Sequence, residues 1–160
     1  MAHPSCGMPR WLREDRLRSG FAVGRLFPAY AVLGLLKHFV PLNRLVQWAW
    51  CPPAGPRNGE VERRLAADML RLSQLTGLPD RDCLQRSLLL YRVLSRAGAD
   101  PTLVVGFQRL DGRIIGHAWV VVDGNPTIEP DADLIRFSPT LHFGSRSRGA
   151  LLPAHRGLAT

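Results

Sequence analysis

The chain has 160 residues, of which 46% are hydrophobic and 21% charged, and its formal net charge is +8. This length and balance are typical of one globular domain, and they exclude a disordered or low-complexity chain. The positive charge would suit an acidic peptide, a membrane surface or a nucleic acid, but a solvated arginine-rich surface explains it more simply.

The first third of the chain contains a polar segment followed by an apolar one. Residues 10–20 are polar and charged, which favours a short helix or an arm. Residues 28–50 predict one or two apolar helices, with Pro28 in a first turn and Pro41 as a break. The proline-rich stretch 51–59 predicts a loop that separates this helical part from the rest.

The same region bears on where the protein resides. The opening residues are polar and the first apolar run begins near Phe21, which does not suit a secretory signal. The longest apolar stretch, Leu26–Leu36, is too short to span a bilayer. We therefore expect a cytoplasmic protein, while the Phe, Leu, Trp and Tyr content of residues 21–51 leaves peripheral membrane contact open.

Two amphipathic helices are expected in the middle of the chain. Apolar residues recur at helical spacing over residues 60–75, and Gly77 and Pro79 should end that helix. A second helix should run from about residue 82 to residue 96, with Gly98 as its stop. Its expected buried positions include Leu84, Leu88, Tyr91 and Leu94.

The period then changes to that of strands. Residues 102–108 and 114–122 are β-rich and are separated by the turn signal Asp111-Gly112. Asp123-Gly124 marks a second turn, after which a third strand should continue through Thr127 to about Glu129. Helices followed by an antiparallel meander predict an α+β fold.

Three cysteines, Cys6, Cys51 and Cys83, stand far apart and form no C-x-x-C pair. This spacing suits neither a zinc site nor a disulfide framework. An odd number of cysteines in a reducing compartment is typical of free thiols, one of which could be chemically active.

Cys83 has the most suggestive position of the three. It falls in the first turn of the expected helix, directly after Asp82, a good N-cap residue. A helix N-terminus offers unpaired N–H groups and a partial positive charge, which favour a thiolate and would hold an oxyanion. The carboxylate of Asp82 opposes the thiolate, so a protonated imidazole would have to outweigh it.

His117 is the candidate base, although a histidine in an apolar strand is more often a packed core residue. A hairpin with a two-residue turn sets His117 opposite Pro130, whereas one added residue sets it opposite Glu129 on the same face. Glu129 would then orient the imidazole as the third member of a triad. Asp131 and Asp133 are rivals, more simply interpreted as solvated acids.

A cysteine on a helix, a histidine on a strand and then an acid is the chain order of papain-like and transglutaminase-like folds. The runs Cys83-Leu-Gln-Arg-Ser and His117-Ala-Trp-Val, followed by Asp123-Gly and Glu129-Pro, add sequence detail to this order. With them, residues 60–143 resemble the transglutaminase-like leader peptidases of lasso-peptide biosynthesis.

The resemblance implies a papain- or transglutaminase-like core and a Cys83–His117–Glu129 peptidase that needs no metal or other cofactor. Its substrate would be a lasso-peptide precursor, cut just before the core peptide. A separate leader-recognition-element protein would present the leader, and an ATP-dependent lasso cyclase would then close the ring. Residues 1–59 would form a helical docking region, and residues 60–160 the peptidase core.

Two other functions stay open on the sequence alone. A transglutaminase-like acyl transferase would share the acyl-enzyme step and pass the acyl group to an amine. A non-catalytic scaffold would bind the precursor or a membrane and bury both Cys83 and His117. Nucleic-acid binding is not expected, because the arginines are dispersed and no recognition motif includes them.

Overall fold

The computed structural model describes residues 23–76, 83–146 and 149–151. The segment 10–20, the helix stops Gly77 and Pro79, and the cap Asp82 lie outside the described residues. The elements, in chain order, are α1 (Val23–Leu36), α2 (Leu42–Ala49), α3 (Gly59–Thr76), α4 (Cys83–Arg96), β1 (Thr102–Leu110), β2 (Arg113–Val122), β3 (Asn125–Pro126), α5 (Asp131–Leu134) and β4 (Ser138–Gly144). The α+β prediction is therefore confirmed.

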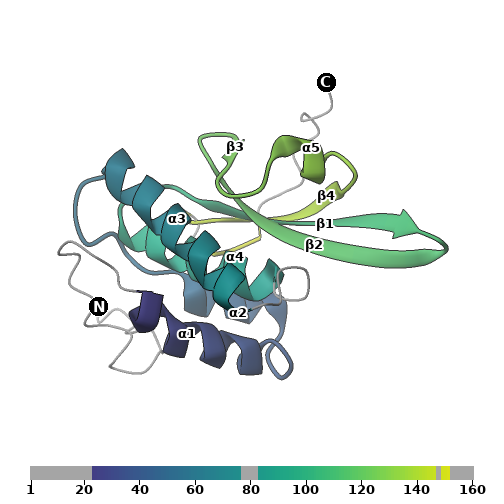
Figure 1. Ribbon diagram of the computed structural model, residues 1–160, viewed down its shortest axis with the longest axis horizontal. Coiled ribbons are helices and arrows are strands. Elements are labelled where there is room, and N and C mark those ends of the chain that lie inside the picture. The colour runs from purple at the N-terminus through teal and green to yellow at the C-terminus, as the bar shows by residue number, and fades with distance from the viewer. Residues whose placement is uncertain (1–22, 77–82, 147–148, 152–160) are drawn as a thin grey trace.

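The strands form one antiparallel sheet in the order β3-β2-β1-β4, with helices α1–α4 on one face and α5 on the other (Figure 1). Side chains alternate between the two faces along each strand. Leu103 and Val120 belong to the core that the helices cover, whereas Val104 and Trp119 pack with Leu134. The sheet is thus apolar on both faces.

Helix α4 lies at the centre of the main core. Every side chain from Gln85 to Ser95 is buried, including Leu88, Tyr91 and Leu94 as predicted, while Leu84 is half-buried. The described helices of the N-terminal region, α1 and α2, join the same core. Their buried members are Leu26, Ala29, Tyr30, Leu33, Leu45, Val46 and Ala49.

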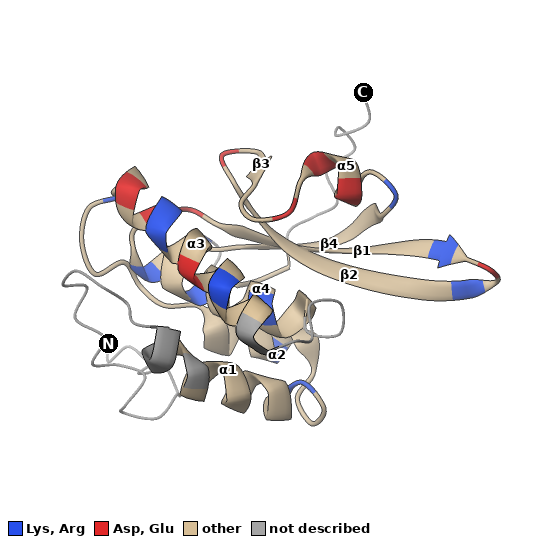
Figure 2. Cartoon of the chain, viewed as in Figure 1, with Lys and Arg blue, Asp and Glu red and all other residues tan. Residues whose placement is uncertain are grey.

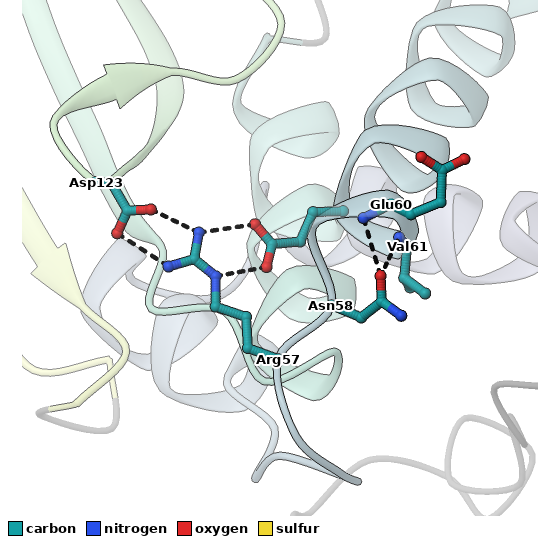
Figure 3. A network of polar contacts seen from close by, with 6 residues as sticks. Arg57, Asn58, Glu60, Val61 and Asp123 are labelled. Carbon is teal, nitrogen blue, oxygen red and sulfur yellow. Dashed lines mark hydrogen bonds and ion pairs between the residues drawn. The ribbon is translucent and has the colours of Figure 1, made fainter.

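Helix α3 begins where the sequence predicts and has an identifiable cap. The side-chain oxygen of Asn58 accepts the backbone N–H groups of Glu60 at 2.9 Å and Val61 at 3.3 Å (Figure 3). Asparagine is among the best N-cap residues because its oxygen satisfies donors that have no intrahelical partner. Residues 51–58 form the expected irregular connection.

The two prolines of the first helical region behave differently from one another. Pro41 precedes α2 as its N-cap residue, so the predicted break is confirmed. Pro28, expected in a first turn, lies well inside α1, which begins at Val23. Its ring is exposed while Ala29 and Tyr30 beside it are buried, so core packing offsets the lost helical hydrogen bond.

Both Asp-Gly turns are confirmed. Asp111 and Gly112 have φ angles of 49° and 75°, and Asp123 and Gly124 have 52° and 82°. Two consecutive residues with positive φ form the tight hairpin turn whose twist matches that of the strands.

The third strand is shorter than predicted, because β3 contains only Asn125 and Pro126. Pro126 has no N–H to donate, and the ladder ends after the N–H of Thr127 donates to the carbonyl of Val120. Pairing of Val121 with Pro126 also shows that the turn contains no added residue. The bulge that would set Glu129 opposite His117 is therefore absent.

The far end of the β1–β2 hairpin extends beyond the body of the molecule (Figure 1). Its exposed apolar side chains are Phe107, Leu110, Ile114 and Ile115. Among the described helices, none combines the length and the apolar character needed to cross a membrane.

Candidate active site

Cys83 is the first residue of α4, and its side chain is half-buried. Two contacts hold the following turn of the helix in place. The Gln85 amide donates to the backbone carbonyl of Tyr30 in α1, and the Ser87 hydroxyl donates to that of Ala118 at 2.8 Å. The start of α4 is thereby fixed against α1 and against β2.

His117 lies in β2 opposite Gly106 and is half-buried. Its ring stacks on two aromatic rings, with centroid distances of 6.0 Å to Trp119 and 5.0 Å to Phe137. A Cβ on Gly106 would lie 2.8 Å from the Trp119 ring, so the glycine leaves the space that this ring occupies. Strand alternation starts the His117 side chain on the α5 face, whereas α4 covers the other face.

Glu129 lies in the connection between β3 and α5 and points its carboxylate at α4. Its Oε1 is 2.5 Å from Nη2 of Arg86, and the two side chains are only 12% and 9% exposed. Arg86 also donates to the hydroxyl of Ser73 in α3 at 3.2 Å. Because Arg86 follows Cys83 by three positions, this ion pair draws Glu129 toward the helix face that carries the thiol.

Cys83 and Glu129 therefore lie at the first two turns of α4, whereas the His117 side chain stacks on Phe137 on the other face of the sheet. Cys83 opens the helix, Ser87 is bonded to the residue after His117, and Arg86 is bonded to Glu129. The rivals Asp131 and Asp133 lie elsewhere, exposed in the first turn of α5.

Sequence reasoning assigned no role to Gln85 and Ser87, although both position the helix start. Their position in the sequence could have indicated this role. Polar side chains in a helix that is buried on all sides need hydrogen-bond partners in neighbouring elements. Arg86, between Gln85 and Ser87, forms the ion pair with Glu129.

A second anchor lies at the turn before Glu129. The Arg57 guanidinium contacts the carboxylates of Asp123 and Glu62, at 2.6 Å each. Figure 3 shows the contact with Asp123. These hydrogen bonds lower the pKa of Asp123 and raise that of Arg57. Arg57 thus joins the β2–β3 turn to α3.

The remaining thiol that the structure describes is remote from this site. Cys51 is 3% exposed and shares a cavity of about 380 Å³ with Ser95 and Asp100, at the C-terminal end of α4. Within the described residues, no group of three or more His, Cys, Asp or Glu side chains is arranged to hold a metal ion.

Comparison with known proteins places this arrangement in a family. No curated protein and no solved structure shows a significant match to the chain. Residues 29–142 match the family described as the transglutaminase-like superfamily, a span that includes α4 and all but the end of the sheet. The chain therefore belongs to the transglutaminase-like superfamily, whose domain indicates the activity of a cysteine peptidase or an acyltransferase.

Proposed function

We propose that this protein is a cysteine peptidase that removes the leader from a lasso-peptide precursor. Cys83 is the nucleophile, His117 the general base and Glu129 the third member of the triad. Membership of the transglutaminase-like superfamily supports thiol chemistry, and the Cys83-Leu-Gln-Arg-Ser and His117-Ala-Trp-Val runs support the narrower assignment.

The observation that supports the proposal is the attachment of the segments that bear His117 and Glu129 to the first two turns of α4, through the Ser87–Ala118 and Arg86–Glu129 hydrogen bonds. A half-buried thiol at a helix N-terminus remains within reach of a substrate while backbone N–H groups surround it. Position 117 lies at the outer edge of the described sheet, since β3 pairs only with Val121 and Val122. No strand of the described sheet therefore covers the edge of β2 at His117, around which the imidazole would turn to reach the helix start.

In the proposed reaction, His117 takes the thiol proton of Cys83 and the sulfur attacks the carbonyl carbon of the scissile peptide bond. The backbone N–H of Cys83 stabilises the resulting oxyanion. The C–N bond breaks as His117 returns the proton to the leaving amine. Water, deprotonated by His117, then attacks the thioester, releases the carboxylate of the leader and restores the thiol.

Glu129 serves this cycle through its charge. With Oε1 bonded to Arg86, Oε2 would accept the ring N–H of His117 and stabilise the imidazolium that forms when the thiol is deprotonated. Arg86 holds the carboxylate in place for that contact. The ring of His117 would leave its stacked position on Phe137 to reach both partners.

The proposed partners follow from the leader-peptidase assignment. A separate leader-recognition-element protein presents the precursor, and a lasso cyclase acts on the product. The region 1–59 is the proposed docking surface for the recognition protein, with exposed Leu35 and Phe39 as its apolar contacts. We place the reaction in the cytoplasm.

The test is cleavage of a precursor in the presence of its recognition protein, followed by mass spectrometry. Cys83→Ala should abolish cleavage while circular dichroism stays unchanged. Cys51→Ala is the matched control, because it removes a thiol at the opposite end of α4 and should keep full activity. Cleavage by Cys83→Ala near the wild-type rate would sink the assignment.

Acyl transfer to an amine is the second candidate. It is favoured by the match to the transglutaminase-like superfamily. Both reactions share the thioester and differ in the molecule that attacks it. Products that gain the mass of water support hydrolysis, whereas products that gain the mass of an added amine support transfer.

A further inference from the structure

A cavity of about 660 Å³ lies on the face of the sheet opposite α4, between the strands and α5. This volume is within the range of sites that bind small molecules or side chains. Its wall is mostly apolar and comes from β1, β2 and the segment around α5. The residues that form most of this wall are Val104, Trp119, Val121, Leu134, Ile135 and Phe137.

The cavity borders the candidate base. Trp119 and Phe137 line it, and the same two rings stack on His117. The rings are therefore a shared wall, with the imidazole on one side and the cavity on the other.

One edge of the cavity carries an acidic side chain, although the protein as a whole is basic. Asp131 lines it, and Asp133 follows on the same short helix, seen as the red segments of α5 in Figure 2. Neither carboxylate has an ion-pair partner in the part of the chain that the structure describes. Asp131 and Ile135 are four positions apart, so a charge and an exposed apolar side chain occupy one edge of the cavity.

We propose that this cavity is a specificity site for the peptide substrate, and that it binds a large apolar side chain next to a lysine or arginine. The apolar side chain fills the space over Trp119, and the neighbouring cation pairs with Asp131. This inference rests on the proposed peptidase function, because it assigns the cavity to the peptide that Cys83 would cut. A net charge of +8 disfavours binding of a basic peptide over most of the surface, and Asp131 gives this edge of the cavity the opposite charge.

The experiment measures binding without turnover. The full-length Cys83→Ala variant is titrated into a short fluorescein-labelled peptide in which Phe-Arg is flanked by Gly and Ser, and anisotropy reports the Kd. Replacing Phe by Ala in the peptide should weaken binding at least about tenfold. Replacing Arg by Gln should weaken it about two- to fivefold, as expected for an exposed ion pair.

Variants of the protein locate the contacts. Val121→Phe adds volume inside the cavity and should strongly weaken binding of the Phe-Arg peptide. Ile114→Phe, on the exposed hairpin, should leave that binding unchanged. Asp131→Asn should raise the Kd of the Phe-Arg peptide and leave the Kd of the Phe-Gln peptide unchanged. Asp111→Asn is its matched control, because it removes a carboxylate at the distant β1–β2 turn.

The outcomes separate this inference from the proposed function. Equal binding of the Phe and Ala peptides, insensitivity to Val121→Phe, or no measurable binding of the Phe-Arg peptide would each overturn the specificity site. Because the readout is binding by an inactive variant, none of these results depends on cleavage. The peptidase assignment would instead be overturned if the Cys83→Ala variant still cleaved the precursor.

Discussion

The guanidinium of Arg86 lies 2.5 Å from a carboxylate oxygen of Glu129, and both side chains are almost entirely buried. The pair joins the second turn of α4 to the connection that follows β3. Each buried charge is stabilised by the other, because removal of one leaves an uncompensated charge in the interior.

Arg86→Met should destabilise the protein by about 3 kcal/mol, because it leaves the Glu129 carboxylate buried without its partner. Urea unfolding measures this loss. The double variant Arg86→Met with Glu129→Leu should recover much of it, as both charges are then gone. A double variant that is less stable than Arg86→Met would contradict the coupling.

Glu129→Gln tests the catalytic role of the same residue. The Gln amide oxygen can still accept the Arg86 hydrogen bond, so the fold should persist at reduced stability. The charge that stabilises an imidazolium is lost, and kcat/KM for precursor cleavage should fall about 10²–10⁴-fold. Unchanged turnover by a folded Glu129→Gln would remove it from the triad, and Asp131→Asn and Asp133→Asn would be assayed next.

Two serines on α4 form a matched pair for a stability experiment. Ser87 and Ser95 are both 2% exposed, but among the described residues only Ser87 has a hydrogen-bond partner, the Ala118 carbonyl. Ser87→Ala should cost about 1–3 kcal/mol, because the buried carbonyl is left unsatisfied. Ser95→Ala should be neutral or stabilising, since its hydroxyl oxygen is buried without a hydrogen bond. Equal effects in urea unfolding would show that the bond to β2 contributes nothing.

Gly98 ends α4 with φ +84°, and a Cβ there would lie 2.7 Å from the carbonyl oxygen of Gly55. Gly112 also has a positive φ, but nothing lies within 4 Å of its missing Cβ. Gly112→Ala should therefore cost only the backbone penalty of about 1–2 kcal/mol. Gly98→Ala should cost clearly more, because the backbone of the 51–58 connection must also move. Thermal unfolding of the two variants makes the comparison, and a smaller loss for Gly98→Ala would refute it.

The Arg57–Asp123 contact predicts a specific acid dependence of stability. The hydrogen bond from Arg57 lowers the pKa of Asp123 below its ordinary value of 3.8, so the ionised carboxylate favours the folded state. Its contribution is present at pH values above that ordinary value and is lost as the pH falls through the lowered pKa. The stability difference between the wild type and Asp123→Asn should therefore shrink on acidification. A difference that stays constant between about pH 6 and pH 2 would disprove the linkage.

Local patterns accounted for much of this fold. Apolar spacing predicted α3 and α4, and Asp-Gly pairs predicted both tight turns, because helix faces and positive φ angles depend on neighbouring residues alone. The same local reasoning placed Cys83 at a helix start and His117 on a strand beside Trp119.

Contacts between distant segments account for the rest. Helix α5 and strand β4 were not anticipated, and β4 pairs with β1 across an irregular register between Val105 and Gly106. The partner of Glu129 was also missed, since one residue more or less in a turn changes every cross-strand neighbour. The sequence pattern therefore indicates which side chains could take part in thiol chemistry. The packing of α4 against the sheet determines which side chains lie next to one another. Such packing depends on side chains far apart in sequence, as Arg86 and Glu129 are, and no local period records it.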